Sequence, residues 1–292
     1  MASSPRRLIW LLSILIVLAS SSVWAGPLKY KSVEFTSADP STTLISGLIL
    51  KPQGAGPFAA VVMLHGCSGM LTKSGKLKKR PTQWSRLLVA EGYLVLLADS
   101  FTARGHHSIC RIKNRPVHPN VERPYDAYGA LQYLQSRADV RADRITLMGW
   151  SNGAMTLLWT VKADATQRPT NLRHDFRAAI GFYPGCVQIS KTPYATRIPT
   201  LLQIGAADDW TLPKPCLRMV ATASSRGSPI TADAHAGAYH NFDHPTSKVK
   251  TIITRNSVYK SGQKRVHVGS NPKARQASID NVKTYLARHL AD

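Results

Sequence analysis

The chain has 292 residues, 43% of them hydrophobic, and it carries 38 Lys and Arg side chains against 16 Asp and Glu, a formal net charge of +22. This apolar content is enough for a folded core and excludes a disordered chain. The charge attracts anionic surfaces, but no nucleic-acid-binding motif accompanies it, which argues against a protein that binds nucleic acid specifically.

The first 25 residues have the three-part build of a secretory signal. Arg6 and Arg7 precede an apolar run, which is followed by three serines and by Val23-Trp24-Ala25. The run is shorter than a transmembrane helix requires, although an uncleaved membrane anchor is the alternative. We therefore expect cleavage after Ala25, a secreted or periplasmic protein, and a single domain over residues 26–292.

Beyond this segment, short apolar runs alternate with helical patterns. The first two runs, Tyr30–Thr36 and Thr43–Leu50, predict an antiparallel pair of strands. Further strands are expected at Ala59–Leu64, Tyr93–Ala98, Arg144–Met148, Ala178–Phe182, Thr200–Ile204 and Ile230–Ala234, and helices at Thr82–Glu91, Tyr125–Arg137, Asn152–Lys162 and Pro272–Leu290. Residues 248–270 are basic and weakly patterned, so we expect a long surface excursion there. The alternation predicts an α/β fold with a mostly parallel eight-stranded sheet and helices on both faces.

Residues 149–153, Gly-Trp-Ser-Asn-Gly, fit the G-x-S-x-G pattern of a nucleophile elbow. The pattern follows an expected strand and opens an expected helix. A sharp turn at this point needs small flanking residues, and a helix N-terminus favours negative charge. We therefore expect Ser151 to be a nucleophile. Backbone N–H groups for an oxyanion hole would come from Asn152 and from Cys67, in the glycine-rich turn after Leu64.

A serine hydroxyl needs a general base, and the base needs an acid that orients it. Asp208 and Asp209 follow the strand that ends at Ile204, and His240 follows the strand that ends near Ala234. This order of serine, acid and histidine is the one that the elbow motif requires, and ligands of parallel sheets bind beyond the carboxyl ends of the strands. We expect one of the two aspartates to orient His240 as the base, whereas His65 is expected to be structural.

Several spaced motifs lie between about residue 59 and residue 244: LHGCSG, DSF with a following RG, RPYDAYGALQYL, GWSNGA, YPGC, IGAADDWTLPKPC and YHNFD. Together they resemble the dienelactone hydrolase family of α/β-hydrolases. The resemblance implies an α/β-hydrolase fold, a monomeric or weakly associating enzyme without metal or cofactor, and a small-molecule ester or lactone substrate. It assigns the nucleophile to Ser151, the base to His240, and the acid to Asp208, which stands three residues after Gly205 as in the family's G-x-x-D turn.

The chain departs from the founding members of that family, which are cytosolic and have a cysteine nucleophile. A serine nucleophile is compatible with ester hydrolysis, but it does not decide whether the substrate is a lactone. Two other functions are compatible with the pattern: a secreted serine peptidase or polymer esterase with the same triad, and a non-catalytic binding module with a hydrolase fold. The intact set of serine, acid and histidine argues against the binding module.

Four cysteines remain in the mature chain, and none of them forms a C-x-x-C pair. An even number in a secreted chain indicates disulfides. Cys67 and Cys110 follow neighbouring strands of the expected sheet, and so do Cys186 and Cys216. Because neighbouring parallel strands end at one edge, we expect the disulfides Cys67–Cys110 and Cys186–Cys216. The alternative is that one pair stays as buried free thiols.

Basic residues cluster at Lys73–Arg80, Arg104–Arg123 and Lys248–Arg275. Such clusters predict weak association with anionic surfaces, and the alternative is a solvated face that keeps the protein soluble. The clusters lie mostly away from the catalytic motifs in sequence. We therefore expect the charge to affect where the protein sits rather than its chemistry.

Overall fold

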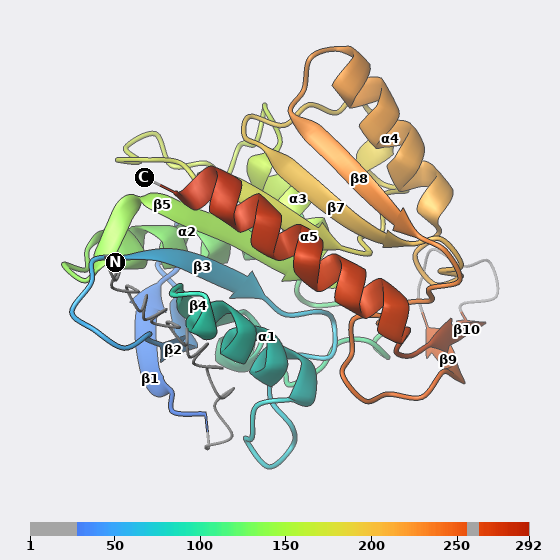
Figure 1. Cartoon of the computed structure of the whole chain (residues 1–292), viewed down its shortest axis with the longest axis horizontal. Helices are drawn as coiled ribbons and strands as arrows, with labels where there is room; N and C mark the ends of the chain where they lie inside the picture. Colours follow the sequence, from blue (N-terminus) through green and yellow to red (C-terminus); the bar gives the residue numbers. More distant parts are fainter. Residues whose placement is uncertain (1–27, 256–262, 292) are drawn as a thin grey trace, which may run out of the picture.

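An eight-stranded mixed sheet forms the middle layer of the protein (Figure 1). The computed structural model describes residues 28–255 and 263–291. The strands follow the order β1-β2-β4-β3-β5-β6-β7-β8 across the sheet, and β2 is antiparallel to both of its neighbours whereas the remaining neighbours from β4 to β8 are parallel. Their bounds are β1 Lys31–Thr36, β2 Leu44–Leu50, β3 Phe58–Leu64, β4 Leu94–Asp99, β5 Val140–Trp150, β6 Ala178–Phe182, β7 Thr200–Gly205 and β8 Ile230–His235.

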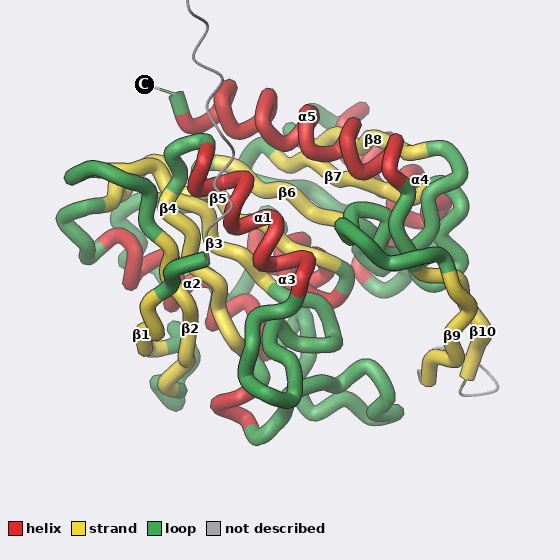
Figure 2. Tube along the Cα trace, turned by 60° about the horizontal axis from the view of Figure 1, so that its bottom comes forward, coloured by secondary structure: helices red, strands yellow, loops and turns green. Residues whose placement is uncertain are grey.

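Helices cover both faces of this sheet (Figures 1 and 2). One apolar core packs the sheet against α2, α3 and α4, and a second packs it against α1 and α5. Alternate residues of β3 enter the two cores, with Val62 in the first and Val61 in the second, as the pleat of a doubly covered strand requires. The predicted fold class is therefore confirmed. The helices are α1 Lys79–Ala90, α2 Glu122–Gln135, α3 Asn152–Val161, α4 Pro213–Ser225 and α5 Pro272–Leu290, with short 3-10 turns at Thr102–Arg104 and Ile189–Lys191.

Two elements differ from the sequence-based expectation. Residues 248–270, expected as a long surface excursion, contain an antiparallel pair that was not predicted, β9 (Lys250–Arg255) and β10 (Gln263–Val268), which stands off from the main sheet (Figure 2). Its alternation is weak because polar and basic residues stand on both faces. Helix α4 was also not predicted, because its buried stripe of Cys216, Met219, Val220 and Ala223 is short and contains small residues.

Two disulfides tie loops together at the carboxyl end of the sheet. Cys67, after β3, is bonded to Cys110 with their Cα atoms 4.9 Å apart, and Cys186, after β6, is bonded to Cys216 in α4 with a Cα separation of 5.1 Å. These are the two pairings expected from the sequence. The signal expected at residues 1–25 lies outside the described residues. Within residues 28–255 and 263–291, no helix combines the length and the apolar character that crossing a membrane requires.

Candidate active site

A sharp turn between β5 and α3 carries Ser151. This residue has φ 51° and ψ −114°, in a region of positive φ that residues other than glycine rarely adopt. A Cβ atom on Gly149 would lie 2.5 Å from the carbonyl oxygen of Gly153, and one on Gly153 would lie 2.2 Å from that of Leu64. Both glycines are therefore required by the close approach of backbone, and the G-x-S-x-G pattern forms the tight elbow that was expected of it.

His240 links the elbow to the acid turn after β7. Its Nε2 lies 3.0 Å from the Oγ of Ser151, and its Nδ1 lies 2.8 Å from Oδ2 of Asp208. A Cβ atom on Gly205 would lie 2.5 Å from the carbonyl oxygen of Ala238, so the loop that carries His240 packs directly on the end of β7. The three side chains singled out in the sequence thus come together from three strand ends.

The Asp208 side chain is fully buried, and its carboxylate is held by several donors. It accepts the backbone N–H groups of Trp210 at 2.8 Å and Thr211 at 2.9 Å, and the Thr211 hydroxyl at 2.8 Å. Burial opposes its ionisation, but the charge and hydrogen bond of His240 and the bonds from Thr211 outweigh burial and lower the pKa of Asp208. The ionised carboxylate is thus an acceptor facing Nδ1 of His240, while Nε2 on the other side of the ring faces the hydroxyl of Ser151.

Asp209 is turned to a different partner. Its Oδ1 accepts the backbone N–H of His267 at 2.8 Å, its Oδ2 lies 2.8 Å from Nδ1 of the same histidine, and its carbonyl oxygen accepts Nζ of Lys264 at 2.6 Å. Asp209 therefore fastens β10 to the acid turn. This contact could not be predicted from the sequence, because no residue close to Asp209 in the chain indicates β10 as its partner.

Aromatic rings fix the position of His240 from two sides. The ring centroids of Tyr183 and Trp210 lie 4.5 and 4.7 Å from that of the imidazole. The Tyr183 hydroxyl donates to Oδ1 of Asp243 at 2.6 Å, so the loop after β6 is tied to the loop that carries the histidine.

Asp243 is the centre of a buried hydrogen-bond network. Besides the bond from Tyr183, its Oδ2 accepts the indole N–H groups of Trp84 at 2.8 Å and Trp150 at 2.7 Å. The network joins α1, β5 and the His240 loop. These residues were given no role in the sequence-based predictions, although three of them lie in the motifs YPGC, YHNFD and GWSNGA.

The turn after β3 lies against the elbow. A Cβ atom on Gly66 would be 3.5 Å from the Cβ of Ser151, and Cys67 is the next residue. The N–H of Asn152 opens α3 and belongs to the first turn, whose N–H groups have no partner within a helix. Both segments expected to supply oxyanion donors therefore border the serine.

His65 is buried beside this turn and connects two strand ends. Its Nε2 accepts the backbone N–H of Ser100 at 3.2 Å and lies 3.6 Å from Oδ1 of Asp99. Burial, and secondly the charge of Arg123, lower the pKa of His65. Its contacts are those of a structural residue, as expected.

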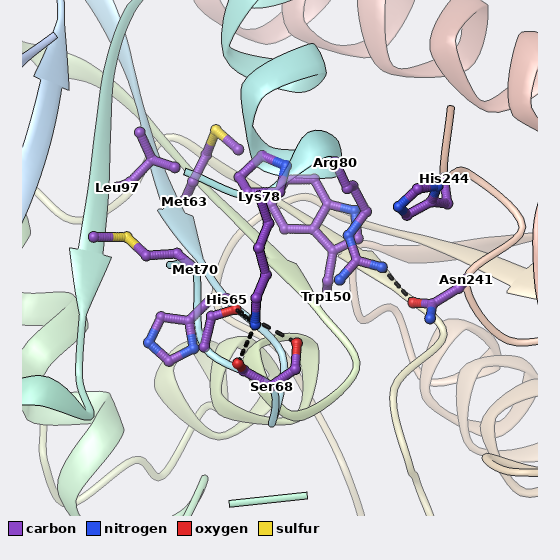
Figure 3. A pocket seen from close by; sticks show the side chains of 12 residues that line it. Met63, His65, Ser68, Met70, Lys78, Arg80, Leu97, Trp150, Asn241 and His244 are labelled. Carbon is purple, nitrogen blue, oxygen red and sulfur yellow. Dashed lines mark hydrogen bonds between the residues drawn. The ribbon is translucent and has the colours of Figure 1, made fainter. Parts of the chain in front are cut away.

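A cavity of about 300 Å³ opens beside the same turn (Figure 3). Lys78 points toward Ser68 and donates to the backbone carbonyl of that residue and, at 3.2 Å, to that of Gly69. Arg80 donates to Asn241 and, at 2.9 Å, to the hydroxyl of Tyr183. The lining comprises Met63, His65, Ser68, Gly69, Met70, Lys78, Arg80, Pro81, Leu97, Trp150, Asn241 and His244.

Two members of the basic cluster Lys73–Arg80, Lys78 and Arg80, thus line this cavity. The basic clusters lie mostly away from the catalytic motifs in sequence, but Lys78 and Arg80 lie beside the turn after β3 in the fold. Chain folding explains the difference, because the loop before α1 returns to the end of β3. Among the described residues, no group of three or more His, Cys, Asp or Glu side chains could hold a metal ion.

Comparison with known proteins identifies the family and the fold of the chain. A model of the dienelactone hydrolase family matches residues 45–290. Among solved structures, esterase 2 of Thermogutta terrifontis phosphoramylated by tabun aligns with a TM-score of 0.61 and 15% identity, over 89% of this chain and 96% of that one. A putative dienelactone hydrolase from Klebsiella pneumoniae aligns with a TM-score of 0.58 and 15% identity over 89% and 99% of the two chains.

A third structure is the dienelactone hydrolase-like promiscuous phosphotriesterase P91 from metagenomic libraries, with a TM-score of 0.60 and 14% identity, over 89% of this chain and 98% of that one. At such identities the likeness establishes the fold, and the expected α/β-hydrolase fold is confirmed. The search of curated protein sequences found no match.

Proposed function

Because the chain belongs to the dienelactone hydrolase family, we propose that it is a secreted serine hydrolase that cleaves carboxylic ester or lactone bonds of small molecules. The observation that carries the proposal is the continuous chain of contacts from Ser151 through His240 to Asp208, at 3.0 and 2.8 Å. A non-catalytic binding module has no need of this arrangement. The two disulfides support an oxidising compartment, where such bonds persist.

Acylation would begin with proton transfer from Ser151 to Nε2 of His240. The serine oxygen attacks the carbonyl carbon, and the electron pair of the carbonyl bond moves onto its oxygen. Backbone N–H groups of Cys67 and Asn152 stabilise this oxyanion. Collapse of the tetrahedral intermediate expels the alcohol, which takes the proton from His240 and leaves an acyl group on the serine.

Deacylation would repeat the same steps with water as the nucleophile. His240 accepts a proton from the water, the resulting intermediate collapses, and the carboxylic acid leaves as the proton returns to Ser151. Asp208 keeps the imidazole in its orientation and stabilises its charged form throughout. The cavity beside Ser68 and Lys78 offers room for a part of the substrate next to the reacting carbon.

Labelling with a fluorophosphonate tests the proposal, because this reagent phosphonylates an activated serine. That an esterase of the same fold is phosphoramylated by tabun supports the choice of reagent. Peptide mapping should find the adduct on Ser151, and Ser151→Ala should lose both labelling and turnover of p-nitrophenyl esters. Ser225→Ala, on the exposed end of α4, is the matched control and should behave as the wild type.

An adduct elsewhere, or ester turnover that survives Ser151→Ala, would contradict the assignment. Assays of the wild type on peptide nitroanilides and on a polyester film separate the proposed activity from a peptidase or a polymer esterase with the same triad. Failure of every one of these assays, without labelling, would leave the chain as a binding module.

A further inference from the structure

Arg123, the second residue of α2, is a fully buried cation that connects the two backbone segments beside Ser151. Its side chain is 0% exposed. One guanidinium nitrogen donates to Oδ1 of Asn152, and the other donates to the carbonyl oxygen of His65 at 2.9 Å. Asn152 opens α3, and His65 begins the turn that contains Cys67.

The charge of Arg123 is not neutralised by a direct partner. No described acidic residue forms a direct ion pair with Arg123, and Asp126, on the same helix, is paired with Arg104 at 2.9 Å. The guanidinium carbon lies 5.0 Å from the ring centroid of Phe101. Burial lowers the pKa of Arg123 to about 10, against the smaller opposing charges of Asp126 and Asp99. Burying an ion in this way is unfavourable. A neutral side chain at this position would therefore stabilise the fold more if the contact were purely structural.

Two further buried groups at this place remain unsatisfied. Among the described residues, neither Nε of Arg123 nor Nδ2 of Asn152 has a hydrogen-bond partner. Such groups are rare in folded proteins, so each one calls for a specific explanation. The arrangement is therefore maintained at a cost, directly behind the backbone that faces the serine.

We propose that Arg123 is a positioning residue for the oxyanion hole. It holds Asn152 and the His65–Gly69 turn at a fixed separation, and its positive charge stabilises the oxyanion. This inference rests on the proposed function, since it requires acyl transfer at Ser151. A guanidinium is a planar fork with two donor arms in fixed geometry. It can therefore set the distance between two acceptors, whereas a lysine ammonium would supply the charge without the spacing.

The test compares Arg123→Met, Arg123→Lys and Asn152→Ala with the wild type. The matched control is Arg197→Met, since Arg197 also binds backbone carbonyls and a tyrosine hydroxyl, at Thr160, Lys162 and Tyr128, but not at the site. Two quantities are measured for each variant: kcat and KM on a p-nitrophenyl ester, and the inhibition constant of an aryl trifluoromethyl ketone. Both are normalised to the concentration of active sites found by titration. Addition of Ser151 to this ketone forms a hemiketal alkoxide, with the serine proton on His240, and so reports on oxyanion binding without turnover.

Arg123→Met should lower kcat about 100-fold with KM within about threefold, and it should weaken ketone inhibition by a similar factor, because an oxyanion donor is worth about 10² to 10³ in rate. Arg123→Lys should fall between Met and the wild type. Asn152→Ala should lose part of the same effect, and adding Arg123→Met to it should cost less than the product of the two single losses. Arg197→Met should reduce thermal stability and leave both readouts unchanged.

A fall in melting temperature with unchanged kcat and ketone inhibition per active site would overturn the inference and make Arg123 a structural residue. If Arg123→Met does not fold, Arg123→Lys and Asn152→Ala decide, and wild-type ketone inhibition in both would overturn it equally. A wild type without ester turnover or labelling refutes the proposed function, and the inference with it. If the wild type is active and the Arg123 and Asn152 variants match it in kcat and in ketone inhibition, only the inference about Arg123 is refuted.

Discussion

Asp209 binds His267 through both of its carboxylate oxygens, each at 2.8 Å, and is thereby turned away from His240. Its neighbour Asp208 accepts Nδ1 of His240 at the same distance. The two adjacent aspartates therefore have different partners: Asp208 bonds to the imidazole of His240, and Asp209 fastens the β9–β10 pair to the turn after β7.

We expect Asp208→Asn to lower kcat about 10⁴-fold, or about 5 kcal/mol of transition-state stabilisation, because an amide favours the wrong tautomer of the histidine. Asp209→Asn should cost less than about tenfold, because it loosens β10 without touching the imidazole. Steady-state kinetics on a p-nitrophenyl ester measure both variants. The opposite ranking would show that the acid has been assigned to the wrong residue.

The strand ends of this site could be predicted from the sequence because each one is local. Apolar runs next to a glycine mark the ends of β5 and β7, β8 alternates apolar and polar residues, and the order of Ser151, Asp208 and His240 is read from the sequence without distances. The choice between Asp208 and Asp209 required the family turn, since both stand at the same strand end. The structure adds a physical reason to prefer Asp208, because the carboxylate of Asp209 is bonded to His267 instead of His240.

The supporting contacts could not be predicted, because they join segments that are far apart in the chain. The Asp243 network links residues separated by 159, 93 and 60 positions, and the fork of Arg123 spans 58 positions to His65. No period or motif records such pairs. The β9–β10 pair was missed for a different reason, since its residues are too polar on both faces to alternate.

A second prediction concerns acid stability. The pKa of Asp208 is lower in the folded protein than its usual value near 4, so between those two values the unfolded chain binds more protons. The stabilisation from this carboxylate is therefore complete above about pH 4 and is lost as the pH falls through the folded pKa. We expect the melting temperature of the wild type to drop below pH 4, and that of Asp208→Asn to start lower at pH 7 and change less in acid. Calorimetry from pH 7 to 3 decides this, and parallel curves for the two proteins would refute it.

A third prediction separates the two duties of the basic cluster. Lys73, Lys76 and Lys79 are exposed, whereas Lys78 binds the carbonyl groups of Ser68 and Gly69. Replacing the three exposed lysines with Gln should weaken retention on heparin and on anionic vesicles, and the retention of the wild type should fall steeply with salt. Turnover of a neutral ester should stay within about twofold, since screened surface charges act at long range on anionic partners.

Lys78→Gln is the matched variant for that experiment. It removes one charge but also releases the turn beside Ser151, so its turnover should fall while heparin retention changes less than in the triple variant. Equal loss of turnover in both variants would mean that surface charge acts on the chemistry. Unchanged retention in the triple variant would place the anion-binding surface elsewhere.

The last prediction concerns the two disulfides, which close chain separations of 43 and 30 residues. Loop entropy gives each of them about 3–4 kcal/mol of stability. Replacing both cysteines of either pair with Ala should therefore lower the free energy of unfolding by about that amount. Chemical denaturation measures it, and peptide mapping without reductant verifies the remaining bridge.

The effects of the two pairs on catalysis should differ. Cys67 lies in the turn next to Gly66 and Ser151, so loss of the Cys67–Cys110 bridge lets an oxyanion donor move and should lower kcat more than it raises KM. The Cys186–Cys216 bridge holds α4 behind the acid turn, and its loss should act through stability with kcat nearly unchanged at temperatures where the protein stays folded. An equal fall of kcat in both variants would contradict this division, because it would show that the two loops support the site only through global stability.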